Sequence, residues 1–101
     1  MVVISKTILN NFIADYPDSA EAFLKWYQAV KDANWSNFNE LRRDFGSADS
    51  VGNDRYVFNI KGNNFRLVAL IIFKTRTLFI LFIGTHQMYD KIEAKTVKFK
   101  N

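Results

Sequence analysis

The stretch from Leu67 to Gly84 is almost entirely apolar and is broken once, by Lys74-Thr75-Arg76. A helix needs about 20 apolar residues to cross a bilayer, so neither half is long enough to do so. We therefore expect two buried strands, Asn64 to Phe73 and Thr77 to Gly84, joined by a turn at Thr75-Arg76. Because both runs are apolar on both faces, they are typical of central strands that are covered, at least in part, on both sides.

A hairpin precedes these apolar runs. Arg55 to Ile60 alternates in the manner of a strand, and Gly62-Asn63 is a turn dipeptide that tolerates the positive φ of tight hairpins. With this turn, Asn59 faces Arg66, and paired residues point to the same side of the sheet. One face of the hairpin is then apolar. The other face gathers Asn59, Lys61, Asn64 and Arg66.

The second hairpin is expected to extend this polar cluster. If Thr75-Arg76 is its turn, Arg66 lies opposite Thr85. Thr85 can cap a short helix from His86 to about Ile92. The only histidine of the chain then sits beside Arg66, and Tyr89 follows within one helical turn.

The N-terminal half has the periodicity of helices. Apolar side chains at three- and four-residue spacing predict helices over residues 5–16, 18–34 and 36–45. We expect Asp18 and Ser36 to cap the second and third helices, Gly46 to end the third in the left-handed conformation, and residues 47–54 to be irregular. Helices followed by an antiparallel meander indicate one α+β domain over residues 1–101. In it, the N-terminal helices pack on one face of the sheet, and a short C-terminal helix precedes a basic tail from about residue 93.

The numbers of cysteine and histidine residues limit the kinds of metal and disulfide site that the chain can form. The chain has no cysteine and one histidine, which excludes a disulfide framework, a thiolate metal site and a multi-histidine zinc site. We expect no metal and no cofactor. The N-terminus lacks the apolar segment and cleavage site of a signal peptide, so the expected location is the cytoplasm, with no membrane association.

Charge is distributed unevenly along the chain. Residues 1–54 carry a net charge of −3 and residues 55–101 a net charge of +7. This asymmetry indicates a basic surface that faces a polyanion, or else a solvated basic tail. The tail lysines do not explain all of it, because residues 55–94 alone carry a net charge of +4.

The polar cluster has the residue types needed to cleave RNA through the ribose 2′-hydroxyl. Lysine and arginine stabilise charge that develops on a phosphodiester, histidine transfers protons near neutral pH, and tyrosine stacks on a base or donates a proton. Each residue also has a structural interpretation. Arg66 can pair with Asp90 or Glu93, Lys61 can be a solvated turn residue, His86 can be bonded locally, and Tyr89 can be a packed aromatic.

Three stretches resemble the HigB-type toxins of the RelE superfamily, which are mRNA interferases of type II toxin–antitoxin systems. These stretches are WYQAVKDANW (residues 26–35), FGSADSVGNDRYVFNIKGNNFRL (residues 45–67) and GTHQMYDKI (residues 84–92). Related sequences often have Glu where this chain has Met88, so the last helix is expected to be capped less well. The resemblance implies a RelE-like fold and mRNA cleavage on the ribosome that leaves a 2′,3′-cyclic phosphate. It also implies a helix-turn-helix antitoxin as partner.

Carried over by residue, the resemblance implies that Lys61 and Arg66 grip the scissile phosphate. His86 and Tyr89 are then the acid/base and stacking candidates, and Asp90 orients or anchors the last helix. The residues expected to bind RNA around them are Arg55, Asn59, Asn64, Lys74 and Lys91.

Two other interpretations stay open. A non-catalytic RNA-binding module, or an inactive toxin relative, would carry the same basic face without cutting. An interaction domain would instead use Trp26 and Tyr27 of the second helix to dock a partner. The sequence predicts neither the base preference nor the oligomeric state.

Overall fold

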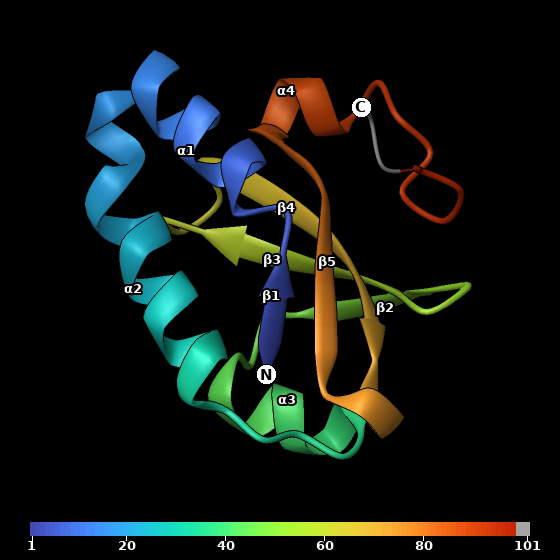
Figure 1. The fold of residues 1–101 in the computed structure, drawn as a ribbon. Coiled ribbons are helices and arrows are strands. Elements are labelled where there is room, and N and C mark those ends of the chain that lie inside the picture. Colours follow the sequence, from blue (N-terminus) through green and yellow to red (C-terminus); the bar gives the residue numbers. More distant parts are fainter. Residues whose placement is uncertain (99–101) are drawn as a thin grey trace.

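The computed structural model describes residues 1–98 and has one five-stranded sheet (Figure 1). In chain order, the elements are β1 (Val2–Ile4), α1 (Lys6–Asp15), the 3₁₀ turn η1 (Pro17–Ser19), α2 (Ala20–Asp32), α3 (Phe38–Asp44), β2 (Asp49–Gly52), β3 (Arg55–Ile60), β4 (Phe65–Ile72), the 3₁₀ turn η2 (Phe73–Thr75), β5 (Thr77–Thr85) and α4 (His86–Tyr89). The strand order is β1-β5-β4-β3-β2, with β1 parallel to β5 and every other pair antiparallel. The predicted α+β architecture is confirmed. Among residues 1–98, no helix combines the length and the apolar character that a bilayer crossing requires.

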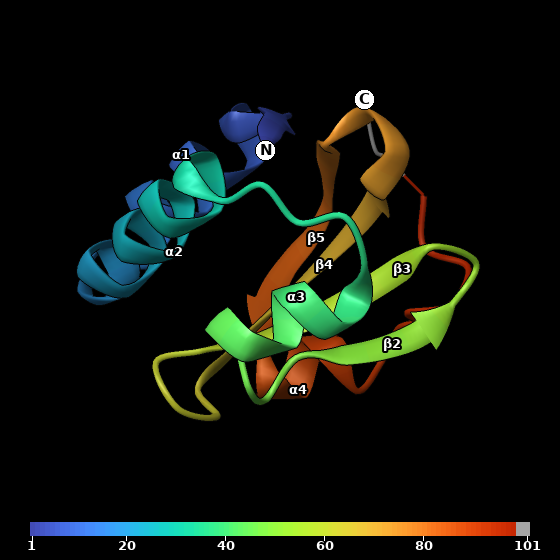
Figure 2. The same ribbon diagram turned by 90° about the horizontal axis from the view of Figure 1, so that it is seen from below.

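The N-terminal helices cover one face of the sheet, which holds the main core. Figure 2 shows α1 and α2 as a layer beside the sheet, with α3 packed near β3. Trp26 of α2 is 2% exposed, and its ring meets Phe58 of β3 edge-on at 5.4 Å between centroids. The interpretation of Trp26 as a docking residue is therefore wrong, because burying an aromatic ring of this size in the core is what holds α2 on the sheet.

The predicted register is right for one hairpin and wrong for the other. Asn59 pairs with Arg66, as expected from a turn at Gly62-Asn63. Arg66, however, lies opposite Gly84 and not Thr85. The turn between β4 and β5 is longer than a dipeptide, since it contains η2 and then Arg76 in the left-handed conformation (φ 54°). A bulge in β5 then shifts the pairing back by one residue.

Several local predictions in the first half are also corrected. Asn37, not Ser36, caps α3, because its side-chain oxygen accepts a hydrogen bond from the Glu40 amide. The Glu40 carboxylate in turn accepts hydrogen bonds from the backbone amide and the hydroxyl of Ser36. The 3₁₀ turn η1 takes the place predicted for an Asp18 cap, and Gly46 does not adopt a positive φ. Residues 49–52 form the edge strand β2, which the sequence does not reveal because Asp, Ser and Gly have low strand propensity.

The second face of the sheet is covered in part by the end of the described chain. We call residues 92–98 the strap. Ile92, Ala94 and Val97 of the strap pack in a small second core with Val57 and Val68 of the sheet. The Arg55 guanidinium donates to the Val97 carbonyl from two nitrogens, at 3.2 and 3.0 Å. Residues 99–101 of the predicted basic tail lie outside the described residues.

Candidate active site

The candidate site lies at the end of the sheet where β5 passes into α4, beside the turn between β3 and β4. Thr85 lies opposite Phe65 at the last rung of the β4–β5 pair. The His86 amide donates to the Asn64 carbonyl at 3.2 Å. Two segments that are about 20 residues apart in the chain are thereby held together by backbone bonds.

Gly84 allows α4 to lie close to β5. A Cβ atom at this position would be 2.6 Å from Cζ of Phe82 and 2.9 Å from Cβ of Met88. The Met88 atom belongs to α4 and cannot move away without moving the helix. The absence of a side chain at Gly84 therefore sets the position of His86 and Tyr89 relative to the sheet.

Replacing Gly84 with alanine is expected to lower the free energy of unfolding by about 1–3 kcal/mol, the usual cost of overpacking. Urea denaturation of purified protein measures this loss. Gly46→Ala is the matched control, because the nearest atom to its added Cβ is 4.0 Å away. Equal stability of the two variants would show that α4 can shift freely, contrary to the close contact described above.

Arg66 presents its charge at this end of the sheet. One of its Nη atoms donates to the Asn63 carbonyl at 3.3 Å, and Cζ lies 5.9 Å from the centroid of the Tyr89 ring. No carboxylate among residues 1–98 lies within ion-pair distance of the guanidinium, so the alternative interpretation of Arg66 as an ion-pair partner of Asp90 or Glu93 is wrong. A half-buried cation on an aromatic face, without a described counter-ion, is suited to binding an anion.

His86, the first residue of α4, forms a pair with Asp90, which directly follows the helix. Nδ1 of His86 lies 3.1 Å from Oδ2 of Asp90, and the two side chains are 50% and 59% exposed. The predicted cap of this helix is confirmed, since the Thr85 hydroxyl oxygen accepts from the Met88 amide. With Nδ1 turned to the carboxylate, Nε2 has no hydrogen-bond partner among the described residues and is open to a ligand.

The Tyr89 hydroxyl is affected by the charges of Arg66, Asp49 and Asp90. Burial raises the pKa of this hydroxyl, Asp49 and Asp90 raise it further, and the Arg66 charge partly opposes them. Asp49 belongs to β2, where it pairs with Val57. Sequence reasoning missed Asp49, because its place near the site depends on a strand that the residue pattern does not predict.

The raised pKa of Tyr89 predicts a loss of stability in alkaline solution. The folded state holds the phenolic proton more tightly than the unfolded chain, so this contribution is complete below the ordinary value of 10.0 and is lost as the pH rises through the folded pKa. Above about pH 10, the melting temperature should therefore fall less with rising pH in Tyr89→Phe than in the parent. Tyr56→Phe should act in the same direction, since burial also raises the pKa of that hydroxyl. Identical melting profiles of parent and variant would contradict the burial of the Tyr89 hydroxyl.

Lys61 does not lie with this group, and its predicted place on the Arg66 face is wrong. Its backbone is left-handed (φ 54°), which breaks the alternation of the strand. The ammonium group donates to the Asp18 carbonyl at 3.3 Å and lies 3.6 Å from the Asp18 carboxylate. The Lys61 side chain therefore points from the hairpin turn toward the helix layer.

The other residues expected to bind RNA are spread over the sheet. Asn64 and Lys91 are exposed beside the site, and the Asn59 amide donates to the Ser47 carbonyl at 3.1 Å. Arg55 is bonded to the strap, and Lys74 lies in η2 at the opposite end of β5. The structure thus places the Arg66 guanidinium on the Tyr89 ring and His86 against Asp90 at this end of the sheet. Asn59 pairs with Arg66, and Asn64 and Lys91 are exposed nearby.

Comparison with known proteins identifies the family. Residues 19–92 match the family described as HigB_toxin, RelE-like toxic component of a toxin-antitoxin system. The chain is 33% identical over 94 residues to the mRNA interferase HigB of Escherichia coli O6:H1, a match that covers 91% of each chain. It is 26% identical over 96 residues to the mRNA interferase HigB of Shigella flexneri, covering 93% of this chain and 92% of that relative. The resemblance seen in the sequence is confirmed, and the chain belongs to the HigB toxin family of RelE-like toxic components of toxin–antitoxin systems.

Proposed function

We propose that this chain is an endoribonuclease that cleaves mRNA on the ribosome without a metal ion. The observation that carries the proposal is the placement of Arg66 beside α4, where it has no described counter-ion and where His86 keeps Nε2 open. The curated relatives named as mRNA interferases support this substrate class. As a toxin, the chain would act in the cytoplasm and be neutralised by a cognate helix-turn-helix antitoxin.

The reaction that fits these groups is an attack of the ribose 2′-oxygen on the adjacent phosphorus. The bond from the 2′-oxygen to phosphorus forms, the bond from phosphorus to the 5′-oxygen breaks, and a 2′,3′-cyclic phosphate and a 5′-hydroxyl result. Nε2 of His86 takes the proton of the 2′-hydroxyl, and the leaving 5′-oxygen takes a proton from solvent. Arg66 stabilises the extra negative charge on the phosphoryl oxygens in the transition state.

The remaining side chains are proposed to hold the RNA and the site in position. The Tyr89 ring supports the Arg66 guanidinium, and a base would stack on the ring face that Arg66 does not cover. Its hydroxyl keeps its proton at neutral pH, because its pKa is raised. Asn59, Asn64 and Lys91 would contact the RNA next to the cleaved bond. Lys61 would bind a neighbouring phosphate after releasing Asp18, and Arg55 and Lys74 would meet only a longer RNA surface.

Inducible expression followed by mapping of mRNA 5′ ends tests this function. New 5′ ends within coding regions are expected after induction of the wild-type chain and not after induction of His86→Ala. Circular dichroism of both proteins checks that the variant is folded. RNA binding that depends on salt, without new 5′ ends for the wild type, would make the chain a non-catalytic binder or an inactive toxin relative.

A further inference from the structure

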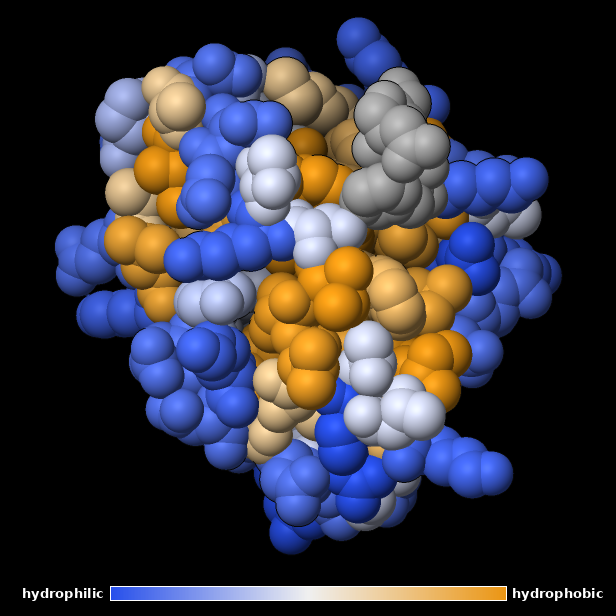
Figure 3. Space-filling view, in the orientation of Figure 1, coloured by the Kyte–Doolittle hydropathy of each residue, from blue (hydrophilic) through white to orange (hydrophobic). Residues whose placement is uncertain are grey.

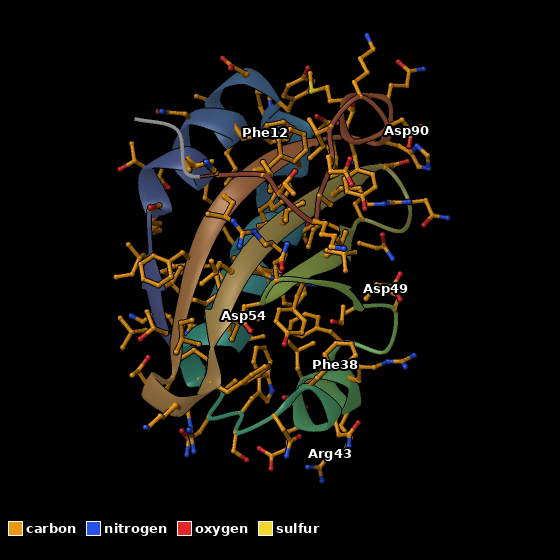
Figure 4. All side chains as sticks on the ribbon, turned by 90° about the vertical axis from the view of Figure 1, so that its right-hand side faces the viewer. Phe12, Phe38, Arg43, Asp49, Asp54 and Asp90 are labelled. Carbon is orange, nitrogen blue, oxygen red and sulfur yellow. The ribbon has the colours of Figure 1, made fainter. Side chains whose placement is uncertain are left out.

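A second feature of the sheet lies away from the candidate site. A groove of about 420 Å³ opens on the strap side of the sheet and is lined by Arg55, Leu70, Ile72, Phe79, Leu81 and Lys98. The apolar residues come from the ends of β4 and β5 that are distant from α4. Figure 4 looks onto this side and shows the strap passing in front of the sheet. The strap thus lies between the groove and the site.

The apolar surface continues from the groove to the edge of the sheet. Ile4 of β1 pairs with Phe79 in a parallel register, and the side chains of Val2 and Ile4 are among the most exposed large apolar ones, at 56% and 39%. Figure 3 shows apolar side chains gathered over β1 and β5, with hydrophilic groups around them. An apolar patch of this kind with a polar rim is typical of a protein interface.

The charge at the groove indicates what kind of partner it fits. Its described lining contains two cations, Arg55 and Lys98, and no carboxylate. Arg55 is bonded to neutral carbonyl oxygens only, and neither cation has a carboxylate within ion-pair distance among residues 1–98. A segment that brings apolar side chains together with Asp or Glu would complement both the apolar floor and the uncompensated charge.

We propose that this groove is a docking site for the antitoxin, which packs apolar side chains onto the strap-side faces of β4 and β5 and sets carboxylates against Arg55 and Lys98. The proposal rests on the proposed toxin function and names the surface by which that toxin is held. Because the strap separates the groove from Arg66 and His86, substitutions in the groove weaken antitoxin binding and leave RNA cleavage intact. RNA is a poor occupant, since an apolar floor gives a polyanion few contacts.

Ile72→Gln and Lys98→Glu test this proposal, with Lys31→Glu on α2 as a charge-matched control outside the groove. The probe is the purified antitoxin encoded beside the chain. Its affinity is measured by calorimetry in the His86→Ala background, so that the toxin can be produced. Both groove variants are expected to weaken binding by at least about tenfold, as loss of a central interface residue does, while the control binds as the parent does. In the active background, they should cleave mRNA at the parental rate and resist neutralisation by the co-expressed antitoxin.

The outcomes separate this proposal from the proposed function. A wild-type chain that cleaves no mRNA refutes the ribonuclease function, whereas groove variants that are neutralised normally overturn only the docking site. A parent that dimerises in light scattering, and an Ile72→Gln variant that does not, would assign the groove to a second copy. A chain shortened after Lys98 that melts several degrees lower, with unchanged antitoxin affinity, would assign the groove to residues 99–101. Because Lys98 is exposed, Lys98→Glu gives an answer even if Ile72→Gln fails to fold.

Discussion

Replacing Arg66 with alanine is expected to slow mRNA cleavage by about 10²- to 10³-fold, the usual cost of removing one group that stabilises transition-state charge. The guanidinium is half-buried against Tyr89 and bonds to backbone carbonyls of its own hairpin, so it is held in one place before RNA binds. The variant breaks no ion pair of the fold, because none involves Arg66 among residues 1–98. It loses the interaction with the developing phosphoryl charge, the contact with Tyr89 and the bonds to the two carbonyls. The rate is measured on a defined mRNA in a reconstituted translation reaction.

Two further variants show whether the loss is specific to Arg66. Arg43→Ala removes the same side chain from α3, where it is 75% exposed and lies far from Asp90 at the opposite end of the view in Figure 4. Its cleavage rate should match the parental rate. Arg66→Lys keeps the charge and loses the planar fork, so its rate should fall between those of the parent and the alanine variant. Full activity of Arg66→Ala, with a normal melting curve, would remove Arg66 from the mechanism.

The sequence predicted those parts of the fold that depend on short-range patterns. The apolar runs, the Asn59–Arg66 pairing and the Thr85 cap each follow from residues that are close together in the chain. The predicted register of the second hairpin was wrong, because a bulge at Leu81 and a left-handed Arg76 depend on packing across the whole sheet. The edge strand β2 likewise depends on its pairing with β3 more than on the strand propensity of its own residues.

The candidate site shows the same division. Arg66 lies against Tyr89 of α4, because the Asn59–Arg66 pairing and the Thr85 cap were both predicted correctly. Lys61 was misplaced, since alternation along a strand does not apply once a residue adopts the left-handed conformation. Asp49 and the covering strap could not be predicted from the sequence, because each approaches the site through contacts between distant segments. The residue types therefore indicated the chemistry of the site, whereas the residues that surround it could be identified only from the fold.

His86→Ala is expected to lower the cleavage rate by about 10²- to 10⁴-fold, the range contributed by a positioned proton-transfer group. Asp90→Asn keeps the imidazole and removes the carboxylate that lies 3.1 Å from its Nδ1 atom, so its rate should fall between those of the parent and His86→Ala. The carboxylate favours the tautomer that carries its proton on Nδ1 and leaves Nε2 free to accept one, and nitrogen chemical shifts of the ring report this tautomer. Gln28→Ala is the matched control, because its partner Asp32 forms the same i,i+4 geometry on α2, away from the site. If Asp90→Asn changed the tautomer without changing the rate, His86 would not be the group that takes the 2′-hydroxyl proton.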